Sequence, residues 1–269
     1  MEQAQEINTE DEVGGLRLEK VTDYASFREY AQKHIALWRP HREFEGVAIA
    51  IDLEEINVAD IPSFVEQGLN DEDPAVRQFS IELASHPKGN GDVDILEKGL
   101  SDPDALVRKS AISILRRLPE DKRAQYIENA LEDEDEDVRF SAIYTVRDVP
   151  QDERTSIVQK ALNSSSAGTQ MEAAMAIHYV PENERAALIS TALDASHPFV
   201  ARDAVHQILY AAEADKVSLV KKALNNSEVF IAQQAYNLID RIPGRNNRIG
   251  LRQSAPNYAK PLRDRLWYN

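Results

Sequence analysis

The 269-residue sequence contains no cysteine, so disulfide bridges, thiolate metal sites and cysteine nucleophiles are excluded. It also lacks long apolar runs. The stretch from Gly46 to Ile51 is among the longest, far short of the roughly 20 residues that span a bilayer. The first 15 residues hold five acids and neither lysine nor arginine, the opposite of a secretory signal. We therefore expect a cytoplasmic protein with no membrane contact.

Positive charge is scarce. The formal net charge is −15, which argues against nucleic acid as the main partner, because phosphate binding depends on lysine and arginine. The exception is the C-terminal segment, residues 241–269, with seven basic residues and one acid, so that it carries +6 and residues 1–240 carry −21. This segment could bind an acidic partner or RNA, or it could fold back and cap the acidic remainder of the chain.

A leucine recurs every 31 residues six times without a slip. We count each repeat from this leucine as position 0. Apolar or small residues keep the same spacing at positions −4, +7, +11 and +15, and proline recurs at +19 in four repeats. Self-similarity at such a period is the signature of a repeat architecture. The six leucines are Leu69, Leu100, Leu131, Leu162, Leu193 and Leu224.

Each 31-residue unit is expected to form two helices. Positions −4 and 0 mark one face of a short first helix, and positions +7 to +18, spaced by three and four, form the buried stripe of a longer second helix. No single pair buries its apolar face, so the units must stack. The fold predicted is all-α, an α-solenoid (superhelix) with an N-terminal helical cap. The regions expected are an acidic disordered N-terminus (1–14), a mostly helical capping region (15–60, with 46–53 either helix or strand), six repeats (61–243) and a basic C-terminal tail or cap (244–269).

The stretches LNDEDPAVRQFS, LSDPDALVRKSA and LEDEDEDVRFSA carry a leucine, an acidic turn, Val-Arg and a small residue. They resemble the HEAT repeat, in particular the short bacterial PBS-lyase HEAT-like type. The resemblance covers residues 61–243 and implies protein–protein binding. It also implies a ladder between the turn aspartate and the arginine of adjacent repeats. Repeats four to six depart from the pattern, since Gln170, Ala201 and Ala232 replace the arginine.

Marks of the enzymes that use such repeats are missing. None of the six histidines is followed by glutamate, as the di-iron site of deoxyhypusine hydroxylase requires, and the acidic repeats lack the cationic face of HEAT-like DNA glycosylases. Metalloprotease, P-loop and dinucleotide fingerprints are absent. We therefore expect no catalytic residue, no metal and no cofactor. Two alternatives to a protein-binding scaffold stay open: a bilin lyase-like or chromophore-handling chaperone, and an RNA-associated scaffold that acts through the basic tail.

Positions +9, +13, +16 and +17 lie on one side of each second helix, which is expected to line the concave face of the solenoid. In repeats three to five these positions are rich in aromatic residues, methionine, arginine and histidine, the types enriched at protein interfaces. We expect a monomer that grips another protein or an extended peptide there, as an adaptor, assembly factor or inhibitor such as an immunity protein. The predicted protein-binding residues are Phe140, Tyr144, Arg147, Met171, Met175, His178, Tyr179, Arg202, His206 and Tyr210.

Overall fold

The computed structural model describes residues 21–38, 56–87, 89 and 91–261. The expectations for the acidic N-terminus, for residues 46–53 and for residues 262–269 lie outside this part of the chain. The molecule forms two compact units, residues 1–114 and 115–269. Each unit is all-helical, as predicted. The described residues hold fourteen α-helices, and their only β-type pairing is an isolated bridge between Val21 and Ile56.

In the first unit a lone helix precedes the first two helix pairs. Its elements are α1 (Tyr24–Trp38), η2 (Val58–Asp60), α2 (Ile61–Gly68), α3 (Pro74–Ser85), α4 (Val93–Leu100) and α5 (Ala105–Ala111), followed by η3 (Ile112–Arg117), in which the unit boundary falls. Helix α1 packs against α2 and α3 and so covers the first pair on the side where a preceding repeat would lie.

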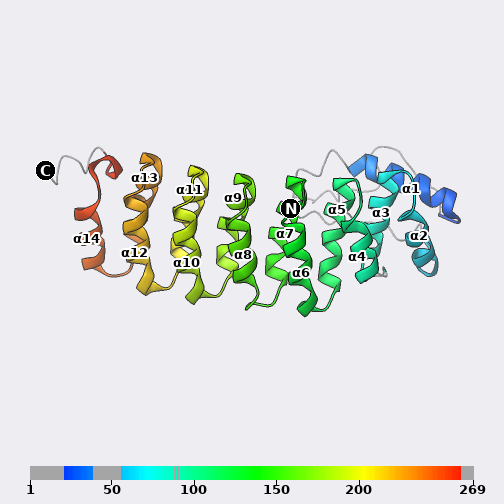
Figure 1. Ribbon diagram of the computed structural model, residues 1–269, viewed down its shortest axis with the longest axis horizontal. Coiled ribbons are helices and arrows are strands. Elements are labelled where there is room, and N and C mark those ends of the chain that lie inside the picture. Colours follow the sequence, from blue (N-terminus) through cyan, green and yellow to red (C-terminus); the bar gives the residue numbers. More distant parts are fainter. Residues whose placement is uncertain (1–20, 39–55, 88, 90, 262–269) are drawn as a thin grey trace, which may run out of the picture. The chain divides into compact units, whose positions relative to one another are not determined.

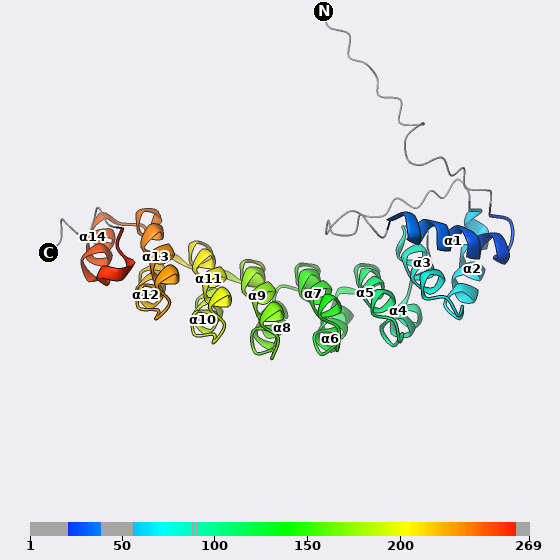
Figure 2. The ribbon, with the colours of Figure 1, turned by 90° about the horizontal axis from the view of Figure 1, so that it is seen from above.

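The second unit repeats a pattern of first helix, second helix and one 3₁₀ turn. Its elements are α6 (Glu120–Ala130), α7 (Glu136–Tyr144), η4 (Thr145–Asp148), α8 (Arg154–Leu162), α9 (Ala167–Ala176), η5 (Ile177–Tyr179), α10 (Glu182–Leu193), α11 (Pro198–Gln207), η6 (Ile208–Tyr210), α12 (Glu213–Leu224), α13 (Val229–Leu238), η7 (Ile239–Arg241), α14 (Arg245–Ser254) and η8 (Asn257–Ala259). Successive pairs stack side by side (Figure 1). The second helices α7, α9, α11 and α13 form one layer and the first helices α6, α8, α10 and α12 the other (Figure 2).

The repeated apolar positions form the core, as predicted. Positions −4, +7, +11 and +15 are buried in all six repeats, and the leucine at position 0 is buried in five. The prediction is wrong for Leu100, which is half-buried. In that repeat the preceding residue, Gly99, is the point where the first helix comes closest to the second. A Cβ added to Gly99 would lie 2.7 Å from the Cβ of Ala111 in α5.

Two further buried columns escaped the sequence analysis. Position −1 is always glycine or alanine and is buried in each repeat, and position +12 is buried in each repeat as well. Small residues at −1 let the first helix approach the second closely. The first column is Gly68, Gly99, Ala130, Ala161, Ala192 and Ala223, and the second is Ile81, Ile112, Ile143, Ala174, Val205 and Tyr236.

Side chains in the turns start the second helices. Asp73, Asp104, Asp135 and Ser166 are N-caps whose oxygens accept from backbone N–H groups of the first helical turn. First helices start differently. The N-caps of α6, α8 and α10 are Pro119, Glu153 and Pro181, and none of the three makes a side-chain capping bond.

The aspartate–arginine ladder is present in the first unit. Arg77 donates two hydrogen bonds to Asp102 of the next repeat, Nε to Oδ2 at 2.7 Å and Nη2 to Oδ1 at 2.9 Å. Helix α1 supplies the rung before it, because Arg28 Nε and the Tyr24 hydroxyl both donate to Asp71, at 3.0 and 2.8 Å. In the second unit Arg139 donates to Thr169 instead, because the turn of the fourth repeat carries serines where the earlier turns carry aspartate.

The bonds to Asp71 in this first rung predict that the stability of the protein falls in acid. Burial acts to raise the pKa of Asp71, but hydrogen bonds from the Asp73 N–H, Tyr24 and Arg28 lower it by more, so its pKa lies below the ordinary value of 3.8. A carboxylate with a lowered pKa contributes stability above its unfolded pKa, and this contribution is lost as pH falls through the folded pKa. We expect urea unfolding midpoints to drop below pH 3.8 more steeply for the wild type than for Asp71→Asn. Equal slopes for the two proteins would contradict this.

A second arginine column joins neighbouring repeats in the second unit. Arg123, Arg154 and Arg185 stand 31 residues apart at the start of α6, α8 and α10. Each donates through Nε to the carbonyl five residues earlier and through Nη1 to the carbonyl 25 residues later, at the end of the next second helix. Arg154 thereby holds the carbonyl of Tyr179 at 3.0 Å, and Arg185 that of Tyr210 at 2.7 Å.

We expect Arg154→Lys to lower the free energy of unfolding by about 1–3 kcal/mol, because lysine keeps the charge but cannot bridge three carbonyls with one planar fork. Urea denaturation followed by circular dichroism measures this loss. The matched control is Arg245→Lys at an exposed position, expected to change stability by less than about 0.5 kcal/mol. Equal effects of the two substitutions would show that the column is not structural.

The chain beyond the sixth repeat begins a seventh. Leu251 and Ala255 in and after α14 continue the columns at positions −4 and 0, and both are buried. Gly244 makes the turn into α14 with a φ of 83°, a backbone conformation that is unfavourable for residues with a side chain. Helix α14 packs against α12, and η8 packs against α13. This packing favours the capping interpretation of the basic tail for residues 245–261.

Candidate protein-binding face

The ends of the second helices carry a row of side chains linked from repeat to repeat. In three successive repeats the side chain at +16 contacts the side chain at +17 of the next repeat, 32 residues later. The pairs are Arg116–Asp148, Arg147–Tyr179 and His178–Tyr210. We call these six residues, with Tyr144 and Met175 beside them, the second-helix ridge. The cross-repeat pairing makes the ridge continuous along α7, α9 and α11.

Arg147 is the centre of the ridge. Its guanidinium lies 4.4 Å from the centre of the Tyr144 ring and donates a hydrogen bond of 3.4 Å to the Tyr144 hydroxyl. Burial acts to lower the pKa of Arg147, but Tyr144 and a hydrogen bond with Tyr179 raise it by more. The cation therefore bonds to both phenols and stacks on the Tyr144 ring.

The aromatic part of the ridge extends to the next repeat. The His178 ring lies 3.9 Å from the Tyr179 ring and 5.7 Å from the Tyr210 ring, and its Nδ1 is 2.7 Å from the carbonyl oxygen of Met175. Yet the ridge is not buried, because 40% of Tyr144, 44% of Met175 and 53% of Tyr210 is exposed to solvent. Aromatic side chains that are ordered by neighbours and still exposed are suited to contact another protein.

Of the ten residues predicted, the structure brings six together in the ridge: Tyr144, Arg147, Met175, His178, Tyr179 and Tyr210. The other four lie apart from these contacts. Phe140 packs on the start of α9, where a Cβ on Gly168 would lie 2.6 Å from its Cζ. Arg202 pairs with Asp203 and lies over the Phe199 ring. Met171 is half-buried and His206 exposed.

Phe199 is a residue that the sequence analysis missed. It lies at the start of α11, is 45% exposed, and its ring centre is 6.2 Å from that of Phe230 at the start of α13. Both residues occupy position +6, outside the positions taken to face a partner. Two phenylalanines at the same position of consecutive repeats were the available signal.

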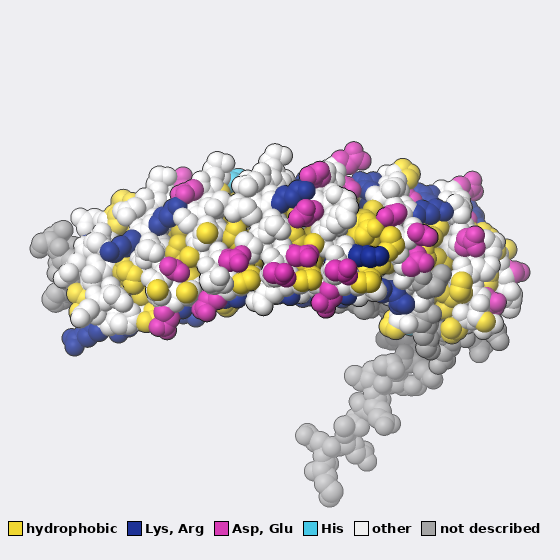
Figure 3. All heavy atoms as spheres, turned by 60° about the horizontal axis from the view of Figure 1, so that its bottom comes forward, with side chains coloured by type: hydrophobic (Ala, Val, Ile, Leu, Met, Phe, Trp, Pro, Cys, Tyr) yellow, Lys and Arg dark blue, Asp and Glu magenta, His cyan; other side chains and the backbone are white. Residues whose placement is uncertain are grey.

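Sites for metal or membrane are not found in the described part of the chain. No three His, Asp or Glu side chains there gather closely enough to hold a metal ion. None of the helices described is both long and apolar enough to cross a bilayer. The space-filling view shows acidic side chains spread among single lysines and arginines over the face it presents (Figure 3), whereas nucleic-acid binding needs a basic patch.

Comparison with known proteins identifies the repeat. A family model described as HEAT repeats matches residues 93–178. Solved structures with a similar fold include YibA of E. coli, with 16% identity, a TM-score of 0.46 and coverage of 78% of this chain and 84% of that one. Human deoxyhypusine hydroxylase in complex with glycerol shows 16% identity, a TM-score of 0.40 and coverage of 83% and 92%. A designed armadillo repeat protein shows 19% identity, a TM-score of 0.42 and coverage of 74% and 100%. No curated protein sequence matches.

Proposed function

This chain is a HEAT-repeat protein, and we propose that it is a non-catalytic scaffold that binds a segment of another protein along the second-helix ridge. The repeat fold supports a protein-binding role in general. The observation that favours this particular surface is the continuity of the ridge, whose ordered aromatic side chains are linked across three consecutive repeats and remain partly exposed.

The chemistry of the ridge describes the segment it would bind. Tyr144, Met175 and Tyr210 offer exposed apolar surface for a hydrophobic or aromatic side chain. The phenol hydroxyls and His178 offer hydrogen bonds to the backbone of an extended segment. Because the chain carries a net charge of −15, a partner with basic residues around that segment would associate fastest. Adaptor, assembly factor and inhibitor are all roles for such a surface.

Comparative capture tests the proposal. The wild type, a Tyr144→Ala/Tyr179→Ala double variant and a Ser156→Ala control on the exposed side of α8 are immobilised, and bound proteins are quantified from native lysate. We expect at least one protein to be retained by the wild type and the control and depleted on the double variant. Proteins retained equally by all three would show that the ridge is not the binding surface.

A further inference from the structure

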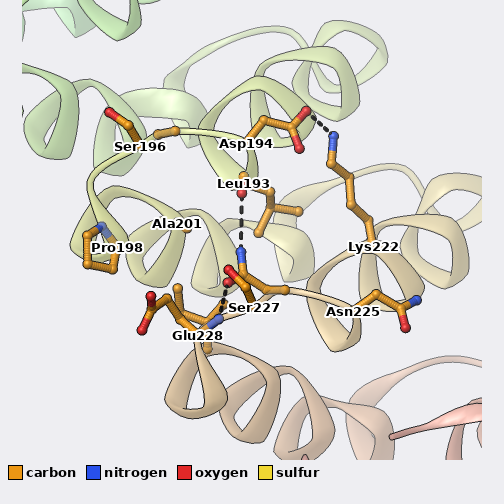
Figure 4. Close-up of a pocket in the computed structure, with 12 residues that line it drawn as sticks. Leu193, Asp194, Ser196, Pro198, Ala201, Lys222, Asn225, Ser227 and Glu228 are labelled. Atoms are coloured by element: carbon orange, nitrogen blue, oxygen red, sulfur yellow. Dashed lines mark hydrogen bonds and ion pairs between the residues drawn. The ribbon is translucent and has the colours of Figure 1, made fainter.

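A cleft of ≈ 600 Å³ lies between the turns of the fifth and sixth repeats, away from the ridge and at the opposite ends of the second helices. Ala195, Ser196 and Ala201 line one side, and Asn226, Ser227 and Glu228 the other. The close-up shows the two turns facing each other across it, with Lys222 bonded to Asp194 at one end (Figure 4).

In the first three repeats an arginine of the chain itself occupies the corresponding place. The Nη1 atom of the arginine at position +8 donates to the carbonyls of positions +2 and +3 in its own turn. In Arg77 the remaining nitrogens reach the carboxylate at position +2 of the next repeat, Asp102. The fourth repeat keeps part of this arrangement, because Gln170 Nε2 donates to the carbonyl of Ser164 at 2.7 Å.

The fifth repeat keeps the acceptors but lacks the arginine, and the two turns are joined instead by a bond of 3.4 Å from Asn226 Nδ2 to the carbonyl of Leu193 (Figure 4). Ala201 stands at position +8, and its short side chain lines the cleft without offering a hydrogen bond. Ala195 and Ser196 stand at the two positions whose carbonyls accept from the arginine in the earlier repeats. Asn226 stands where Asp102 stands, and its Oδ1 accepts from Glu228 N at 2.9 Å, as Asp102 Oδ1 accepts from Asp104 N in the earlier turn.

The edge of the cleft carries both negative charge and exposed apolar side chains. Two carboxylates, Asp194 and Glu228, are exposed there, and the ammonium of Lys222 is paired with Asp194. Glu228 is the N-cap of α13 but makes no side-chain capping bond. Next to the lining residues Pro198 and Glu228, the side chains of Phe199 and Val229 are 45% and 46% exposed. A cationic side chain with an apolar neighbour in sequence would match this edge.

We propose that the cleft accepts an arginine side chain of a partner protein, which supplies in trans the rung that Ala201 removes from the ladder. The carbonyls of Ala195 and Ser196 and the amide oxygen of Asn226 are the acceptors, and Glu228 contributes the charge. Arginine is favoured over lysine because its planar fork presents several donors in fixed directions. This surface is separate from the ridge, so either proposal can fail without the other.

The test titrates the full chain with N-acetyl-arginine methylamide, which mimics an arginine within a polypeptide, and with the lysine analogue and free arginine. Amide NMR shifts report the site. We expect shifts centred on Ala195, Ser196 and Ser227, and about tenfold tighter binding of the blocked arginine than of the blocked lysine, a difference typical of bidentate over point-charge contact. Equal binding of the two would overturn the proposal, as would tighter binding of free arginine, which would indicate a small-molecule site.

Two variants separate the cleft from general surface charge. Ala201→Arg places the guanidinium within the chain and is expected to abolish blocked-arginine binding, whereas Ala187→Arg, at an exposed position of α10, is expected to leave it unchanged. Asn226→Asp restores the carboxylate of the ladder and is expected to tighten binding by about fivefold to tenfold. If Ala201→Arg does not fold, Asn226→Asp decides alone, and unchanged or weaker binding to it would contradict the proposal.

Discussion

Replacing Leu162 with alanine is expected to lower the free energy of unfolding by about 2–5 kcal/mol, the range for a core leucine. Leu162 is 5% exposed at the end of α8, in the column of position 0. A cavity there weakens the packing of α8 against α9, and because repeats are stabilised mainly by their immediate neighbours, no distant contact compensates. Urea unfolding of the full chain measures the loss.

Leu100→Ala is the matched control, because the same residue at the same position of the second repeat is half-buried. We expect it to cost about 1 kcal/mol, the central value for point substitutions. A loss at Leu162 of less than about 0.5 kcal/mol, the size of an ordinary surface effect, would mean that the 31-residue columns are not the core.

Alanine at Tyr179 is expected to weaken binding of the partner by more than about 1 kcal/mol, the threshold for a side chain that matters at an interface. The substitution removes the ring from the middle of the ridge, and it removes the hydrogen bond that orders Arg147. The backbone carbonyl of Tyr179 still accepts from Arg154, so the repeat joint is kept and stability should change little. Isothermal titration gives the affinity, and urea unfolding of the same sample gives the stability.

Tyr179→Phe separates the two effects, because it keeps the ring and loses only the hydroxyl. We expect its affinity to lie between those of the wild type and Tyr179→Ala. If Tyr179 serves only to pack repeats together, Tyr179→Ala should instead unfold at lower urea, with binding lost in proportion to the unfolded fraction.

The all-helical fold could be predicted from sequence because one apolar column, repeated six times, is visible by spacing alone. The column at position −1 was missed for a physical reason. Glycine and alanine give little hydrophobic signal, and what buries them is the close approach of two helices, which only the packing reveals. The burial of Leu100 was overestimated for the same reason, because Gly99, and not Leu100, lies where the first helix comes closest to the second.

The candidate site was predicted in part. Position +13 or +17 placed Tyr144, Tyr179 and Tyr210 correctly on one edge, because equal positions on stacked repeats lie side by side. The cross-repeat pairing at 32 residues was not foreseen, since it depends on how far one repeat is offset against the next. Arg202, at an equally plausible position, contacts Phe199 and Asp203 of its own helix instead, and its spacing in the sequence does not reveal this.

The arginine column of α6, α8 and α10 shows a further limit. Arg154 and its equivalents recur every 31 residues, but in sequence they resemble the solvated charges of an ordinary helix start, and their spacing does not show which groups they bond. Their role depends on carbonyls left free at the 3₁₀ ends of two successive second helices, which lie five residues before and 25 residues after in sequence. Backbone acceptors have no sequence signature, so such joints are found only in the structure.

Site-specific crosslinking tests the central claim most directly. A photoreactive phenylalanine analogue is introduced at Met175, in the ridge, and in a second protein at Ser156, on the exposed side of α8, and each is irradiated with the captured partner. We expect a covalent adduct from position 175 that is lost when Tyr144 and Tyr179 are both alanine, and none from position 156. An adduct from position 156 with none from 175 would contradict it.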